Sequence, residues 1–124
     1  MKNNILHLAI PAILLLAVMA ACTHTEGAVP RISFSQQIMP IIRQSCSINS
    51  SCHIGATNDN GHIDLSDSVA YNTIISKGLV NTASPTSSLM YSEIQTGFMP
   101  PGMHLPANEA KEILDWIKQG ALNN

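Results

Sequence analysis

The feature that most limits what this chain can fold into is the apolar run from Ile5 to Ala21. One cation, Lys2, precedes the run, and two alanines end it directly before Cys22. A basic start, an apolar stretch and small residues at its end are typical of a secretory signal peptide, which is not part of the mature fold. A cysteine at this point predicts a bacterial lipoprotein that is lipidated on Cys22. We expect residues 1–21 to be a signal peptide, 22–32 a lipid-anchored tether and 33–124 the folded domain.

Two other interpretations of this start stay open. One is an ordinary signal peptide cleaved near Cys22, which leaves a free thiol, and the other is an uncleaved anchor helix. Pro11 interrupts the run, which is also short for a membrane span. In the favoured interpretation the protein is anchored to a membrane of the cell envelope and faces the periplasm.

The mature part is about a hundred residues long, which is enough for one small domain. The chain has six Lys or Arg, of which five remain without Lys2, against eight Asp or Glu. With no basic patch, nucleic acid is excluded as a class of partner. Aromatic residues are few, at two Phe, two Tyr and one Trp, so a large apolar guest would help to fill the core. Domains this small often gain stability from a disulfide, a metal or a cofactor.

The apolar residues of the domain recur at three- and four-residue steps in four segments, which predicts four helices with one buried face each. The first helix runs from Phe34 to Cys46, with Ser33 or Ser35 as its N-cap. Pro40 requires either a regular helix that begins near Met39, with the proline in its first turn, or a kink.

The other three helices follow from residue 65 onward. The second begins at 65–67 with a serine cap and ends at Gly78, and the short third helix lies within 84–97. Pro106 begins the fourth and best-defined helix, which Gly120 ends. No segment alternates with the two-residue period of a strand, so the expected fold class is all-α, with about four helices.

Two segments between these helices, 45–61 and 98–105, are rich in turn-forming residues and are expected to be loops. The first holds Cys46 and Cys52-His53. Two thiols followed directly by a histidine are typical of covalent haem attachment, in which thiols add across vinyl groups and the imidazole binds iron. Five residues separate the cysteines, more than in the usual C-x-x-C-H form. Either the longer loop bulges and both cysteines are linked, or Cys52 alone is linked.

The same segment has two interpretations without haem. In an exported domain Cys46 and Cys52 can form a disulfide, with His53 as a surface residue. A zinc site could use both thiols and His53, with His62 as fourth ligand, but the spacing matches no common zinc pattern.

The second loop holds a candidate for the sixth iron ligand. Met99 directly precedes Pro100-Pro101-Gly102, and the prolines keep this segment from forming a helix, so the thioether can be held facing inward. Thioether ligation favours the reduced iron relative to bis-histidine ligation. Met103 and His104 in the same loop, and Met90 on the preceding helix, are the competing candidates. Of these, Met90 is expected to pack in the core.

Five blocks span nearly the whole domain: Phe34-Ser-Gln-Gln-Ile-Met-Pro-Ile-Ile, Cys46…Cys52-His53, Ser87-Ser-Leu-Met-Tyr91, Met99-Pro-Pro-Gly and Ile113-Leu-Asp-Trp-Ile-Lys-Gln-Gly-Ala121. In this order they resemble the class I-like, single-haem cytochrome c domains of exported bacterial lipoproteins, of the type found in Bacteroidetes and Planctomycetes. The resemblance implies a cytochrome c-like fold around one covalently bound haem c. It also implies electron transfer as the function and a redox partner protein in the cell envelope.

Carried over residue by residue, the resemblance implies that His53 is the proximal iron ligand, Met99 the distal ligand and Cys52 a thioether cysteine. Cys46 matches in role but not in spacing. The resemblance also implies that the first and last helices cross. Trp116 is then expected near that crossing or beside the haem, or as a plain core residue.

The sequence holds no Ser/His/Asp set, no paired catalytic carboxylates and no Gly-rich phosphate loop, so no catalytic residue is expected. Asp59, Asp64 and Asp67 are expected to be solvated turn residues rather than calcium ligands. His62 and His104 are expected at the surface, and the two tyrosines, Tyr71 and Tyr91, in packing roles.

Two alternatives to an electron carrier stay open. One is a non-redox lipoprotein that keeps the cytochrome c-like fold and stabilises it with a Cys46–Cys52 disulfide. The other is a small haem peroxidase or sensor, in which Met99 dissociates and opens a position on the iron.

Overall fold

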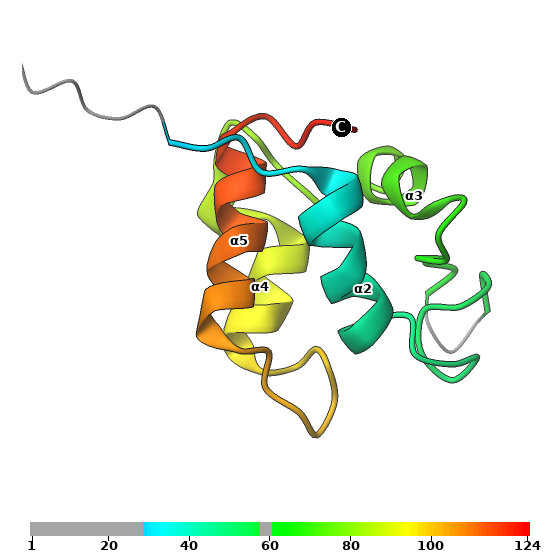
Figure 1. Cartoon of the computed structure of the whole chain (residues 1–124). Coiled ribbons are helices and arrows are strands. Elements are labelled where there is room, and N and C mark those ends of the chain that lie inside the picture. The colour runs from blue at the N-terminus through cyan, green and yellow to red at the C-terminus, as the bar shows by residue number, and fades with distance from the viewer. Residues whose placement is uncertain (1–28, 58–60) are drawn as a thin grey trace, which may run out of the picture.

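The computed structural model describes residues 29–57 and 61–124 (Figure 1). Over these ranges the regular structure is helical without any strand, which confirms the expected all-α class. In chain order the elements are the π-turn η1 (Phe34–Ile38), α2 (Met39–Ser45), α3 (Ala70–Ser76), the 3₁₀ turn η2 (Pro85–Ser87), α4 (Leu89–Thr96) and α5 (Ala107–Lys118). Within the described ranges no helix combines the length and the apolar character needed to cross a membrane. The predicted signal peptide, Cys22 and Asp59 lie outside these ranges.

The first helix begins behind Ser33, whose hydroxyl accepts a hydrogen bond from the Gln36 N–H at 3.2 Å. The Gln37 side chain in return accepts from the Ser33 N–H at 2.9 Å, so donors at the helix start are satisfied. The first turn is a wide π-turn, and the regular α-helix begins at Met39 with Pro40 in its first turn. This is the first of the two predicted alternatives, in which the absent N–H of the proline is tolerated.

Helix α3 begins later than the sequence predicts. The predicted start at 65–67 is wrong, because the regular helix begins at Ala70. The Ser66 carbonyl accepts from the N–H groups of Val69 and Ala70, which makes a turn ahead of the helix. The physical reason is that the Ser66 hydroxyl donates to the Asp64 carboxylate and caps no helical N–H group.

Helices α4 and α5 begin and end close to the predicted Gly and Pro residues. Gly97, which follows α4, has a left-handed φ of 72°. The Phe98 N–H donates to the Glu93 carbonyl at 3.0 Å, and the Gly97 N–H donates to the Ile94 carbonyl at 3.2 Å. This pair of bonds is a Schellman motif, which favours glycine at the left-handed position. Helix α5 follows Pro106 and packs against α4 (Figure 1).

The core is built where the first and last helices meet, since η1 packs against α5. The Phe34 ring lies 5.2 Å from the Tyr71 ring, edge to face, and 5.4 Å from the Trp116 ring. Trp116 is fully buried, and its indole N–H donates to the Leu122 carbonyl at 3.0 Å. The Tyr71 hydroxyl donates to the Ala121 carbonyl at 3.1 Å. The packing role of Tyr71 is thus confirmed, and Trp116 is a core residue.

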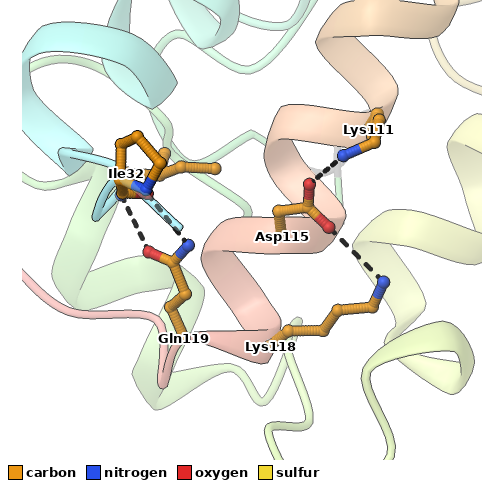
Figure 2. A network of polar contacts seen from close by, with 6 residues as sticks. Ile32, Lys111, Asp115, Lys118 and Gln119 are labelled. Carbon is orange, nitrogen blue, oxygen red and sulfur yellow. Dashed lines mark hydrogen bonds and ion pairs between the residues drawn. The ribbon is translucent and has the colours of Figure 1, made fainter. Parts of the chain in front are cut away.

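Hydrogen bonds join the two ends of the domain beside the C-terminal end of α5. The Gln119 side chain accepts from the Ile32 N–H at 2.8 Å and donates to the Pro30 carbonyl at 3.3 Å (Figure 2). The main-chain oxygen of Asn124 accepts from the Ser35 N–H at 2.9 Å. The segment that enters the domain is therefore tied to the segment that leaves it.

Candidate functional site

A cavity of about 480 Å³ lies between the loop that follows α2, the helix α4 and the loop that follows α4. Its wall contains Cys46, Cys52, His53 and Met99, the four residues that the sequence assigns to a haem site. The rest of the wall is mainly apolar, with Ile48, Ile63, Leu65, Leu79, Leu89, Met90, Ile94 and Met103. Its volume is within the range of about 300–1,000 Å³ that is usual for ligand and cofactor sites. Two loops distant in sequence thus contribute to one site.

His53 is held in place by three hydrogen bonds. Its N–H donates to the Cys46 carbonyl at 3.0 Å, and its carbonyl accepts from the Leu65 N–H at 2.7 Å. Its ring atom Nδ1 lies 3.1 Å from the Ile63 carbonyl oxygen. A carbonyl oxygen can only accept, so in the neutral ring the proton is on Nδ1 and Nε2 keeps a lone pair. Metal-binding histidines are oriented by this kind of bond, which leaves Nε2 to the metal.

The five residues between the cysteines fold into a turn. The Cys52 N–H donates to the Asn49 carbonyl at 3.0 Å, and the Ser51 N–H donates to the Asn49 side-chain oxygen at 2.8 Å. Asn49 and Ser51 are exposed, so the extra length of the loop is taken up at the surface. Because the His53 N–H reaches back to the Cys46 carbonyl, Cys46 stays beside His53 despite the wide spacing.

Both cysteines line the cavity as thiols, and no disulfide joins Cys46 to Cys52. Burial raises the pKa of the Cys46 thiol to about 11, and the nearby Cys52 adds to the increase. A thiol with so high a pKa is protonated at neutral pH and is a weak nucleophile as such. Two sulfur atoms are therefore presented to one apolar cavity, one of them in an environment that disfavours the thiolate.

Three methionines line the cavity, and Met99 is the best placed of them as a ligand. Its N–H donates to the Glu93 carbonyl at 3.1 Å, which fixes its main chain at the end of α4, and its side chain is half-buried. Met103 is 48% exposed. Met90 lines the cavity from α4 and also packs against the core, in line with its expected role.

The remaining candidate ligands lie outside the cavity wall. His62 and His104 are both exposed, as predicted. The His104 ring lies over Gly97, where an added Cβ would be 2.9 Å from His104 Cε1. Within the described ranges no three His, Cys, Asp or Glu side chains gather as a metal site, so the zinc alternative gains no support.

The sequence interpretation missed the residue that joins the His53 segment to its neighbour. Asp64 Oδ1 accepts from the Gly55 N–H at 3.1 Å and from the Ser66 N–H at 2.9 Å, and also from the Ser66 hydroxyl. These hydrogen bonds, those from Ser66 first, lower the pKa of the Asp64 carboxyl. The available signal was the Asp-x-Ser pattern, because Asp often accepts from the main-chain N–H two residues on. Asp67, by contrast, forms an exposed ion pair with Arg43.

The chemistry of the wall fits a large, mainly apolar group that carries an iron. Among the described residues of the wall, Glu93 is the only Asp, Glu, Lys or Arg. Ile48, Leu89 and Met103 line the cavity and yet are 46%, 49% and 48% exposed. Apolar side chains gathered in the open part of a cavity mark a binding site. An imidazole with an Nε2 lone pair, thiols and a thioether are also the groups that hold a covalently bound haem.

Comparison with known proteins assigns the chain to no family. No family model matches it, and neither the curated proteins nor the solved structures give a significant match. The sequence pattern and the cavity are therefore the basis for a proposed function.

Proposed function

We propose that the protein is a c-type cytochrome that binds one haem c in this cavity and transfers electrons. The observation that carries the proposal is the convergence of Cys46, Cys52, His53 and Met99 on a single, mainly apolar cavity. The sequence pattern selects the same four residues without knowledge of the cavity. When bound, the haem iron cycles between Fe(II) and Fe(III).

Each of these residues has a distinct part in the proposal. His53 binds the iron through Nε2, and the bond from Nδ1–H to the Ile63 carbonyl orients the ring and raises its basicity. Met99 would bind the iron through its thioether, which would favour the reduced state. The Cys52 thiol would hold the haem covalently, through a thioether formed with a vinyl group. Cys46, in the same wall, is the candidate for a second thioether.

The proposal extends to the fold and to the location of the protein. Packing of η1 against α5 supports a cytochrome c-like arrangement of the helices around the haem. The apolar run that ends directly before Cys22 supports a lipoprotein anchored in the cell envelope. Such a protein would face the periplasm, where a redox partner protein exchanges electrons with it.

Expression of the full chain with a c-type maturation system tests the proposal. We expect a pyridine haemochrome spectrum of the c type, with one haem per chain that acidified acetone does not extract. A colourless protein with a Cys46–Cys52 disulfide would refute the proposal and favour the non-redox lipoprotein stabilised by that disulfide. Rapid peroxide turnover by the wild-type protein would favour the small peroxidase instead.

Matched methionine variants test the sixth ligand. Met99→Ala is expected to lose the weak near-infrared band of iron–thioether ligation, whereas Met103→Ala, in the same loop, and Met90→Ala keep it. Retention of the band in Met99→Ala, with its loss in one of the other two, would transfer the assignment to that methionine.

Mass spectrometry of the haem peptide 44–58 counts the thioethers. Because both thiols line the cavity, we expect two thioethers in the wild-type protein and one in Cys46→Ala. A single thioether in both proteins would show that Cys52 alone is linked.

A further inference from the structure

Three consecutive residues hold the His53 segment in register. The Ile63 carbonyl lies 3.1 Å from His53 Nδ1, and the Leu65 N–H donates to the His53 carbonyl at 2.7 Å. Between them, Asp64 Oδ1 accepts from the Gly55 N–H at 3.1 Å. The stretch 53–55 is thus joined to the stretch 63–66 through its first residue, His53, and its last residue, Gly55.

These contacts differ in how far they depend on the sequence. Ile63 and Leu65 contribute main-chain atoms, which almost any residue at these positions supplies. Asp64 contributes a side-chain oxygen, which most substitutions remove. The same oxygen accepts from the N–H and hydroxyl of Ser66, so the carboxylate is itself fixed. Of the three contacts that residues 63–65 make to the stretch 53–55, only that of Asp64 comes from a side chain, and Asp64 does not line the cavity.

We propose that Asp64 is the positioning residue for His53. Its hydrogen bond from the Gly55 N–H keeps the two stretches in register. The Ile63 carbonyl then stays within hydrogen-bond distance of His53 Nδ1–H, which selects the tautomer in which Nε2 has no proton. Neutral histidine in water exchanges between its two tautomers, and a fixed acceptor at Nδ1 selects one of them. The consequence for iron binding rests on the proposed function, whereas the selection of the tautomer also applies to the haem-free chain.

The test compares Asp64→Ala with two matched variants. Asp64→Asn keeps a side-chain oxygen that can accept from Gly55 and Ser66. Asp67→Ala removes a neighbouring carboxylate that pairs with Arg43 at the surface. Two-dimensional ¹H–¹⁵N NMR of the histidine rings is recorded on the full, haem-free chain at a pH where the rings are neutral. We expect the Nδ1–H pattern for His53 in the wild type, Asp64→Asn and Asp67→Ala, and a mixture of tautomers in Asp64→Ala.

A second readout uses the haem-loaded protein. Asp64→Ala is expected to shift the midpoint potential, because His53 loses a fixed hydrogen bond that sets its basicity. Asp64→Asn should restore the wild-type potential, and Asp67→Ala should leave it unchanged. A role of Asp64 in stability alone would not produce this pattern, since Asp64→Asn and Asp64→Ala would then differ only in unfolding.

A single Nδ1–H tautomer in folded Asp64→Ala would overturn the proposal. If Asp64→Ala does not fold, Asp64→Ser replaces it, since its shorter side chain can bond locally but does not reach Gly55. Unmixed tautomers in Asp64→Ser would then overturn the proposal equally. If the chain binds no haem, the proposed function fails, while the NMR result still decides the role of Asp64.

Discussion

The contact between η1 and α5 and the cavity beside α4 are two regions of the same small domain, and they are filled in opposite ways. In the first, Ile38, Ile113 and Trp116 are fully buried and belong to the packed hydrophobic core. In the second, imidazole, thiol and thioether groups face about 480 Å³ of open space. Main-chain hydrogen bonds position His53 and Met99 in the wall of this cavity. We infer that stability and ligand binding depend on different residues and can be separated by mutation.

The largest expected effect contrasts Trp116→Ala with Met99→Ala. Trp116 is fully buried and its indole N–H is hydrogen-bonded, so its truncation should cost about 3–5 kcal/mol of unfolding free energy. Met99 is half-buried in the cavity wall, and its truncation should cost about 1 kcal/mol in the haem-free protein. Urea unfolding followed by far-UV circular dichroism measures both. Equal losses would mean that the cavity wall also belongs to the stabilising core.

The next effect is a pH dependence of the unfolding free energy, caused by the Cys46 thiol in the cavity wall. The folded state raises the pKa of Cys46 from its ordinary value of 9.0 to about 11, so the unfolded chain loses this proton first as pH rises. The stabilisation is complete below pH 9 and is lost as pH rises toward 11. Two pKa units correspond to about 3 kcal/mol, which is the upper limit of the loss expected from this thiol in the haem-free protein.

The matched variant Cys46→Ala isolates this contribution. Other groups titrate over the same range, so the difference between the two unfolding curves is what matters. If wild type and Cys46→Ala lose the same free energy between pH 9 and 11, the thiol is not buried as described.

A smaller effect compares two glycines in the segment between α4 and α5. Gly97 and Gly102 both have a φ of 72°, so alanine at either position should cost about 1–2 kcal/mol. At Gly97 the new Cβ would also lie 2.9 Å from His104 Cε1, whereas nothing lies within 4 Å at Gly102. We therefore expect Gly97→Ala to lower the urea midpoint more than Gly102→Ala does. Adding His104→Ala should remove the difference, and a difference that persists would assign the cost to the backbone.

The smallest effect concerns the surface near the cavity. The Arg43 and Asp67 side chains form an ion pair at 2.7 Å, but they are 54% and 59% exposed, and exposed pairs contribute little to stability. Their hydrogen bond lowers the pKa of Asp67 and raises that of Arg43 without stabilising the fold measurably. Arg43→Ala should leave the urea midpoint unchanged at high salt and nearly so at low salt. A clear loss at both would show that the pair helps to hold the turn before α3.

Local signals predicted most of the helices and the four candidate site residues. Pro40, Gly97 and Pro106 act on their own main chain, so their effects can be read from the sequence without the fold. Met99 and His53 were selected by residue type and order, and the cavity joins them. The late start of α3 and the role of Asp64 were missed, because the Ser66 hydroxyl serves as donor to Asp64. The hydrogen bond from the Ile32 N–H to the Gln119 side chain could not be predicted either. No local sequence signal indicates a partner so distant in the chain.

That last bond has a mechanical consequence. Helix α5 has twelve residues and is about 18 Å long, and Gln119 directly follows its last residue. The segment between α4 and α5, which includes Met99, precedes the other end of the helix (Figure 1). A pull on the chain at Pro30 would first load the hydrogen bonds to Gln119 and Asn124. From there the force would pass into the packed contact between η1 and α5. None of Pro30, Ile32, Gln119 and Asn124 lines the cavity. We therefore expect tension at the entry point of the domain to leave the shape of the cavity unchanged.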